Sequence, residues 1–271
     1  MRLTSIHIYP LKAARAVDLD QARVEPWGLA GDRRWLLVDE DGRFISQREE
    51  PALARVVVSC APDGIRVSAD GRTALVIAEP PAGAAVAKVR IWSDVLMAAA
   101  AGPVADAWFS AYLGRPARLV YLDDPTRRPV DPGFSRDGDV VSFADGYPLL
   151  LTSAGSLAEL GDWLAADGEP PVPMTRFRPS VVVAGAPPWA EDRWRRVRIG
   201  PVLFRVAKPC GRCIVTTTDQ LTGERGRQPL KMLGRHRRFG QALVFGQNLI
   251  PDSGGVVRVG DPVEILAAAE P

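Results

Sequence analysis

The chain has few of the side chains that form disulfides, zinc sites or acid–base catalytic pairs. Its 271 residues include three cysteines and two histidines, too few for the disulfide framework of a small secreted domain. The first residues contain no apolar signal core, and no stretch approaches the ~18 apolar residues of a membrane-spanning helix. We therefore expect a cytoplasmic protein in a reducing compartment, with no membrane partner.

An excess of charge of either sign is also missing. The chain carries 34 Lys and Arg residues against 32 Asp and Glu residues, a net charge of +2. This balance does not indicate a nucleic-acid partner. Hydrophobic residues make up 46% of the chain and charged residues 24%, a composition typical of a folded protein with one large or two small domains.

The spacing of apolar residues predicts many short strands and two helices. Strands are expected in the first half at residues 3–9, 34–38, 56–60, 65–68, 74–77, 86–92 and 119–121. A helical stretch is expected over residues 95–113, and a second helix begins at Thr152 and Ser153 and runs to about residue 164. Further strands are expected at residues 181–183, 195–199, 202–206, 214–218, 256–259 and 263–265. The pattern predicts a mainly β protein with α-helices, in which small barrels or sandwiches are the favoured architecture.

Two of the three cysteines lie in Pro209-Cys210-Gly211-Arg212-Cys213, followed by Ile, Val and three Thr residues. A thioredoxin-like pair needs a helix after the motif, whereas these residues favour a strand. A structural zinc site needs a second pair of ligands, and Cys60, His7 and His236 do not form one. Two interpretations stay open: a thiolate held as a metal ligand or nucleophile, and cysteines that only contribute to the core.

Four other segments place a basic residue in or beside a turn at the end of an expected strand. They are Tyr9-Pro10-Leu11-Lys12, Gly31-Asp32-Arg33-Arg34-Trp35, Gln47-Arg48-Glu49-Glu50-Pro51 and Thr175-Arg176-Phe177-Arg178-Pro179. If the fold brings them together, they form a socket for an anion such as phosphate. Thr152 and Ser153 would add hydroxyls and free backbone N–H groups, and Phe245-Gly246-Gln247-Asn248-Leu249 is expected as a ligand-contacting loop. The alternative is that each segment is an ordinary exposed turn.

Taken in order, these segments resemble the MOSC superfamily, in the branch that has an N-terminal β-barrel domain and includes the mitochondrial amidoxime-reducing component and its bacterial relatives. The resemblance extends over nearly the whole chain and includes Leu151-Thr152-Ser153 with the helix that follows. It implies an N-terminal MOSC β-barrel domain at residues 1–120 and a MOSC-type β-barrel with flanking helices at residues 121–271. Three positions depart from the family pattern and lose or shorten a hydrogen-bonding side chain: Ala13, Gly211 and Ser180.

The resemblance also implies a molybdenum cofactor, Mo-molybdopterin, which is a pterin with a dithiolene and a terminal phosphate. In the family the second cysteine of the motif ligates the metal, so Cys213 is the implied metal ligand and catalytic residue, and Cys210 has a secondary role. The residues implied to hold the cofactor are Lys12, Arg33, Arg48, Thr152, Ser153, Arg176, Arg178 and Asn248.

The activity implied is the reduction of N-hydroxylated compounds, such as amidoximes, hydroxylamines and N-hydroxylated bases. Because the chain ends soon after its last expected strand, we expect electrons to come from a separate ferredoxin, flavoprotein or reductase. An alternative is a sulfur carrier or a protein that binds and delivers the cofactor, since the same fold ends molybdenum-cofactor sulfurases. A plain structural β domain is the third hypothesis.

Overall fold

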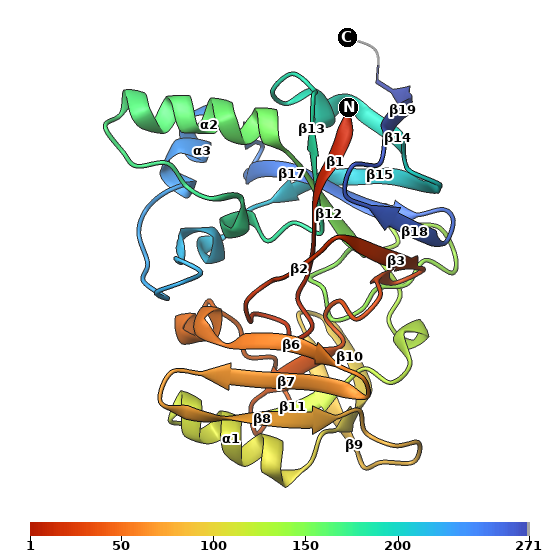
Figure 1. Ribbon diagram of the computed structural model, residues 1–271, viewed down its shortest axis with the longest axis vertical. Coiled ribbons are helices and arrows are strands. Elements are labelled where there is room, and N and C mark those ends of the chain that lie inside the picture. The colour runs from red at the N-terminus through yellow and green to blue at the C-terminus, as the bar shows by residue number, and fades with distance from the viewer. Residues whose placement is uncertain (270–271) are drawn as a thin grey trace.

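The computed structural model describes residues 1–269 as a mainly β protein whose strands form four sheets (Figure 1). The largest sheet has nine strands and includes the first and last strands of this range. Its hydrogen-bonded order is β19 (Val263–Ala268), β14 (Trp194–Ile199), β15 (Val202–Gly211), β17 (Ala242–Pro251), β12 (Leu149–Ser153), β13 (Val181–Ala184), β1 (Arg2–Ile8) and β2 (Val17–Leu19), with β16 (Arg238–Phe239) beside β17. The path stays open, although a bridge between Arg2 and Pro262 brings β1 to the start of β19.

Three smaller sheets complete the β structure. One contains β5 (Trp35–Val38), β11 (Arg118–Tyr121), β10 (Asp94–Ala100) and β9 (Val86–Ile91). Another contains β6 (Val57–Ala61), β7 (Gly64–Ala69) and β8 (Arg72–Ala78), and the last contains β18 (Gly255–Arg258), β3 (Gln21–Glu25) and β4 (Gly28–Leu29). The sheets that contain β6–β8 and β9–β11 lie with α1 (Pro103–Leu113) in the lower lobe of Figure 1, and the nine-stranded sheet lies in the upper lobe.

The first thirty residues pair with strands of the second half of the chain. β1 is antiparallel to β13, with Leu3 opposite Val183, and β3 is antiparallel to β18. A register shift in β1 between Leu3 and Ser5 allows Leu3, Ile6 and Ile8 all to be buried in the core of the upper lobe. The first thirty residues therefore share two sheets with strands from the second half of the chain.

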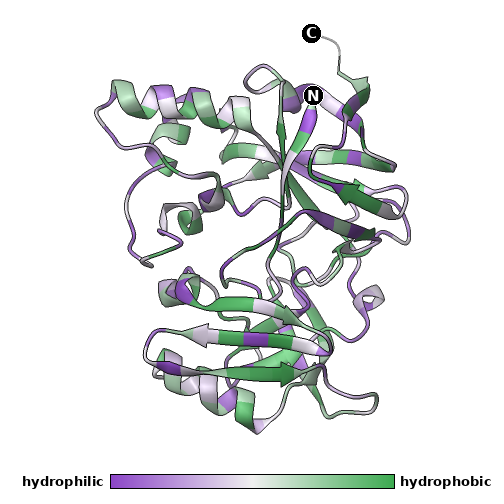
Figure 2. Ribbon diagram, viewed as in Figure 1, coloured by the Kyte–Doolittle hydropathy of each residue, from purple (hydrophilic) through white to green (hydrophobic). Residues whose placement is uncertain are grey.

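Each lobe has its own hydrophobic core, and hydrophobic segments occupy the strands of both (Figure 2). Two helices, α2 (Ala154–Ala166) and α3 (Leu230–His236), flank the nine-stranded sheet and share a cluster with Phe177 and Phe245. These two rings stack with their centroids 3.7 Å apart. Short 3₁₀ turns connect the rest: η1 (Pro51–Arg55), η2 (Pro125–Arg127), η3 (Met174–Phe177), η4 (Ala190–Arg193) and η5 (Ile214–Thr217). No helix within residues 1–269 has the length and apolar character needed to cross a bilayer.

The expected helix over residues 95–113 is wrong in its first half. Residues Asp94–Ala100 form β10, and the helix begins only at Pro103, after Gly102. Alanine-rich sequence does not distinguish a helix from a strand by periodicity, and here the hairpin with β9 supplies the backbone hydrogen bonds. Tertiary pairing therefore overrides the local helix propensity.

The strand expected at residues 214–218 is also wrong, because Ile214–Thr217 forms η5. Its threonine hydroxyls donate back to the chain, from Thr216 to the Cys213 carbonyl at 2.9 Å and from Thr217 to the Ile214 carbonyl at 2.7 Å. Such local bonds compete with strand pairing.

The loop expected at residues 245–249 is instead part of β17. Gly246 has φ +81°, and a Cβ there would lie 2.6 Å from the Leu151 carbonyl oxygen. The glycine therefore allows β17 to approach β12 closely rather than to form a turn.

Candidate functional site

A cavity of about 340 Å³ lies where the two lobes meet. Its lining combines residues from both halves of the chain, and most of the polar residues predicted from sequence are among them. The lining includes Lys12, Arg33, Arg48, Arg178, Lys208, Cys213 and Asn248, together with the segment 144–150 and the cysteine motif 210–213. The fold thus brings basic residues from separate segments and the Cys213 thiol into one cavity. The sequence analysis could state this arrangement only as a condition.

Two arginines are held against the same aromatic ring. The guanidinium carbon of Arg33 lies 4.4 Å from the centroid of Tyr9, and that of Arg178 lies 4.1 Å from it. Arg33 also donates to the buried carboxylate of Asp32 at 2.5 Å, and Asp32 accepts the Tyr9 backbone N–H at 2.7 Å. Cation–π contact and this buried carboxylate keep the like-charged side chains close together.

Arg178 has no carboxylate within ion-pair distance among residues 1–269. It donates to the Ala14 carbonyl at 2.7 Å and to Gln220 Oε1 at 3.1 Å. Burial lowers its pKa to about 10, because a buried cation without an ion-pair partner is costly. An anion in the cavity would supply that compensation.

Strained backbone is concentrated around the cavity. Five non-glycine residues of the described chain have positive φ, and three of them, Ala13, Arg33 and Arg178, line it. Left-handed backbone costs a non-glycine residue about 1 kcal/mol or more and is enriched at functional sites. At Arg33 and Arg178 this backbone conformation directs the side chains into the cavity.

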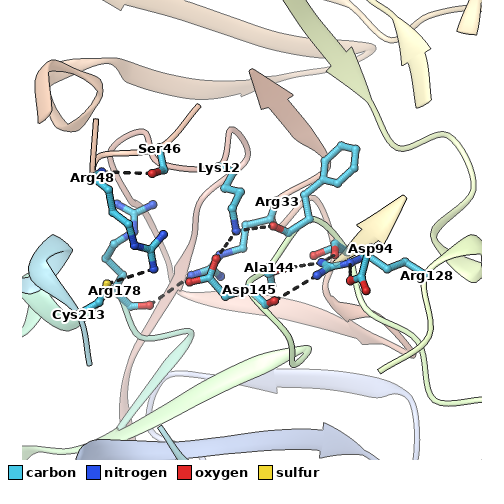
Figure 3. Close-up of polar contacts among 12 residues, drawn as sticks. Lys12, Arg33, Ser46, Arg48, Asp94, Arg128, Ala144, Asp145, Arg178 and Cys213 are labelled. Atoms are coloured by element: carbon cyan, nitrogen blue, oxygen red, sulfur yellow. Dashed lines mark hydrogen bonds and ion pairs between the residues drawn. The ribbon is translucent and has the colours of Figure 1, made fainter. Parts of the chain in front are cut away.

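Lys12 and Asp145 form an ion pair in the cavity, as Figure 3 shows, with Nζ and Oδ1 2.5 Å apart. Lys12 also donates to the Phe143 carbonyl at 2.8 Å. Burial lowers the pKa of Lys12 to about 8, against the opposing effect of Asp145. Removal from water would raise the pKa of Asp145, but Lys12, helped by Arg48 and Arg33, outweighs it and lowers that pKa.

Both cysteines of the motif accept a hydrogen bond from an arginine. Arg48 Nη2 lies 3.2 Å from Cys213 Sγ, an approach drawn in Figure 3, and Arg212 Nη1 lies 2.8 Å from Cys210 Sγ. Cys210 is near the end of β15, whereas Cys213 immediately precedes η5. A guanidinium next to Cys213 suits a sulfur that must be negatively charged to bind a metal.

Three predicted cofactor residues are not brought to the cavity. Thr152 and Ser153 are fully buried on β12, which has a neighbour strand on each side, and their hydroxyls have no hydrogen-bond partner. Ser153 occupies the N-cap position of α2 without capping it through its side chain. Arg176 instead bonds the Thr217 carbonyl at 2.8 Å and Asp219 at 3.0 Å. A role for these three in binding a cofactor stays a prediction, and Arg176 acts on η5 in this structure.

Asp145 is the main site residue that the sequence analysis missed. Its Asp-Gly pair signals a turn, but nothing local indicates that the turn faces Lys12, 133 positions away. The sequence analysis named Tyr9 only as part of a motif. In the structure its ring contacts the guanidinium groups of both Arg33 and Arg178. The three positions that depart from the family pattern, Ala13, Ser180 and Gly211, all line the cavity.

The residues of the cavity suit a metal that has Cys213 as its one protein ligand and takes its other ligands from a non-protein group. Within residues 1–269 no group of three or more His, Cys, Asp or Glu side chains is arranged to hold a metal ion. A metal bound to Cys213 would therefore need soft or oxygen ligands from a non-protein group. Lys12, Arg33 and Arg178 offer the cations that a phosphorylated group requires. The residues present fit a metal cofactor with a sulfur ligand and a phosphate.

Comparisons with known proteins identify two domains in the chain. Residues 1–116 match the model of the MOSC N-terminal beta barrel domain, and residues 138–264 match that of the MOSC domain. Human mitochondrial amidoxime-reducing component 1 is 31% identical over 283 residues, covering 97% of this chain and 82% of that protein. The molybdenum cofactor sulfurase of Danio rerio is 29% identical over 87% of this chain and 30% of its own length.

Among solved structures, the crystal structure of the YUAD protein from Bacillus subtilis covers 97% of this chain and 93% of its own, with 10% identity and a TM-score of 0.44. The two domain matches together cover most of the chain, and the human amidoxime-reducing component matches it over most of both lengths. This chain therefore belongs to the family of MOSC-domain proteins that carry an N-terminal MOSC β-barrel domain.

Proposed function

We propose that the protein is a molybdenum-cofactor-dependent reductase of N-hydroxylated compounds. The observation that carries the proposal is the placement of the Cys213 thiol, bonded to Arg48, in the same cavity as Lys12, Arg33 and Arg178. The relatives named amidoxime-reducing components, at about 30% identity over nearly the whole chain, support this activity.

In this proposal Cys213 Sγ holds the metal, and the cations of the cavity hold the phosphate and the pterin. Arg33 and Arg178 are positioned by Tyr9, so they meet an anion without first losing side-chain freedom. Lys12 contributes a point charge whose strength depends on Asp145. Asn248, whose Nδ2 donates to the Lys208 carbonyl at 3.3 Å, presents an amide oxygen to the cavity for hydrogen bonding.

The net reaction consumes an amidoxime, two electrons and two protons, and releases the amidine and water. The N–O bond breaks, and its oxygen leaves as the water. When bound, the molybdenum group would supply the two-electron reducing centre. A separate donor protein would supply its electrons. The chain's own contribution is to orient the group, exclude water from the cavity, and keep positive charge beside the sulfur.

The test is metal analysis of protein purified from a host that makes the cofactor, comparing wild type with Cys213→Ser. We expect near-stoichiometric molybdenum in the wild type, loss in Cys213→Ser, and no change in Cys60→Ser, which alters an exposed cysteine of the other lobe. Amidoxime turnover with a chemical reductant should follow the same pattern. Wild-type protein without molybdenum, when the host demonstrably supplies the cofactor, would refute the proposal.

A second candidate function is the carriage of sulfur for cofactor maturation. The observation in its favour is Cys210, a second thiol in the same cavity that accepts a hydrogen bond from Arg212; the relative named molybdenum cofactor sulfurase supports it. Persulfide on Cys210 or Cys213 in protein that lacks molybdenum and does not reduce amidoximes would favour this function.

A further inference from the structure

A second depression opens next to the cavity. It has a volume of about 730 Å³ and shares Ser46 and Arg48 with the first cavity. The rest of its lining comes from the turn after β5, the end of β9 and the loop after α1: Asp39, Arg43, Phe44, Glu49, Arg90, Trp92 and Arg115. We refer to it as the arginine groove. Apart from Ser46 and Arg48, none of the residues of the arginine groove has a role in the proposed cofactor site.

Trp92 is an unusual residue for its position in the groove. It lies in the turn between β9 and β10 with φ +54°, yet 47% of its surface is exposed. A left-handed turn of this kind favours Asn, Asp or Gly, and a bulky side chain is disfavoured there. A half-exposed tryptophan in a strained turn is a candidate for a binding role, because backbone strain of this kind is enriched at functional sites.

The ring of Trp92 connects the groove with the metal-binding thiol. Phe44 meets it edge to face with the centroids 4.9 Å apart, and the guanidinium carbon of Arg48 lies 4.4 Å from its centroid. The same Arg48 donates to Cys213 Sγ at 3.2 Å. One side chain therefore separates the aromatic wall of the groove from the predicted metal ligand.

Two arginines give the groove positive charge without ion-pair partners. Arg43 and Arg90 lie side by side, since their backbones form a β-bridge, and neither has a carboxylate within 4 Å among residues 1–269. Asp39 and Glu49 also line the groove; the Asp39 carboxylate accepts the backbone N–H groups of Asp41 and Arg43. Adjacent like charges repel unless an anion lies between or above them.

We propose that the arginine groove binds the part of the substrate remote from its N–O group, and that it selects flat aromatic substrates carrying a carboxylate or phosphate. The aromatic ring packs against the exposed part of Trp92, and the anionic substituent pairs with Arg43 and Arg90. Arg48 lines both the arginine groove and the metal cavity, and it positions the N–O group of the substrate near Cys213. This inference rests on the proposed reductase function and adds the class of substrate.

The experiment compares two substrates that differ only in charge: benzamidoxime and its 4-carboxylate. The holoenzyme is driven by a small chemical reductant, so that docking of a protein donor does not enter the measurement. The quantity measured is the ratio of kcat/KM for the carboxylate substrate to kcat/KM for the neutral one. Wild type is compared with Arg43→Gln, Arg90→Gln and Trp92→Ala, and with Arg66→Gln as control, since Arg66 is an exposed arginine of β7 in the same lobe.

We expect wild type to prefer the carboxylate substrate and each arginine variant to lower the ratio about tenfold or more, the usual effect of one charge-assisted hydrogen bond. Trp92→Ala should raise KM for both substrates. Arg66→Gln should leave the ratio within twofold of wild type. An unchanged ratio in Arg43→Gln and Arg90→Gln would overturn the inference.

A binding measurement separates this inference from the reductase proposal. Calorimetry with 4-carbamoylbenzoate and with benzamide, neither of which can be reduced at an N–O bond, needs no turnover. If wild type reduces neither amidoxime but binds 4-carbamoylbenzoate at least tenfold more tightly than benzamide, and Arg43→Gln and Arg90→Gln lose this preference, the reductase proposal fails while the groove assignment holds. Equal binding of the two ligands overturns the groove assignment.

Discussion

Lys12 is a residue whose charge depends strongly on its surroundings. Burial lowers its pKa from 10.5 to about 8, whereas the unfolded chain keeps the ordinary value. Between these two pH values the folded protein binds fewer protons than the unfolded chain, so the stability contributed by this group rises with pH across that window. Below about pH 8 the lysine is charged in both states and the burial penalty is fully present.

This predicts a pH-dependent difference between wild type and Lys12→Met. Because the variant has no titrating group at this position, wild type should gain about 2 kcal/mol of unfolding free energy relative to it between about pH 8 and pH 10. Urea unfolding at a series of pH values gives the difference. The matched control is Lys88→Met, at an exposed lysine of β9. A difference that stays constant with pH would show that Lys12 has an ordinary pKa.

Among single elements, η5 lies directly after Cys213, the proposed metal ligand, and we expect it to control the position of this thiol. The turn follows Cys213 directly and is held from outside by Arg176, which bonds Thr217 and Asp219. We predict that Arg176→Met loosens this segment and lowers stability by about 1–3 kcal/mol, since a partly buried charged hydrogen-bond donor is lost. The sulfur would then sample positions away from the cavity.

Hydrogen exchange measures this loosening at single amides. The N–H groups of Thr216 and Thr218, which bond the Cys213 and Val215 carbonyls, should exchange at least tenfold faster in Arg176→Met, and molybdenum retention should fall with them. Arg66→Met provides the control. Unchanged exchange at both amides would show that Arg176 does not anchor the turn.

Individual helices and strands also show why some secondary structure could not be predicted from the sequence. The alternation of β1 and of β14–β15 is strong enough for the strands to be predicted correctly within a residue or two at most ends. At β10 and η5 the local residues suit more than one conformation, and the outcome depends on a hairpin partner and on threonine side-chain bonds. β17 contains a glycine and two amides that resemble a turn, but its pairing with β12 and β15 makes it a strand.

For the whole molecule, the pairing of β1 with β13 and of β3 with β18 couples the two ends of the chain. We predict that Leu3→Ala, at a fully buried position of β1, lowers the unfolding free energy by about 2–5 kcal/mol. It should shift a single unfolding transition, because the upper lobe cannot form without the N-terminal strand. Val57→Ala, at an exposed residue of β6, should have little effect.

Calorimetry and tryptophan fluorescence together check this coupling. Coincident transitions that move as one in Leu3→Ala are expected. Two separate transitions, of which only one shifts, would mean that the lobes unfold independently although both line the same cavity.

The mainly β class, the motif of Cys210 and Cys213, and the candidate basic residues could all be predicted from sequence, because each depends on local composition and spacing. Which of these residues meet depends on the three-dimensional fold. It paired Lys12 with Asp145, placed Tyr9 between Arg33 and Arg178, set Arg48 against Cys213, and kept Thr152, Ser153 and Arg176 out of the cavity. These contacts join residues up to about 170 positions apart, and which of them form depends on the register of strands that pair across the two halves, which no local pattern specifies.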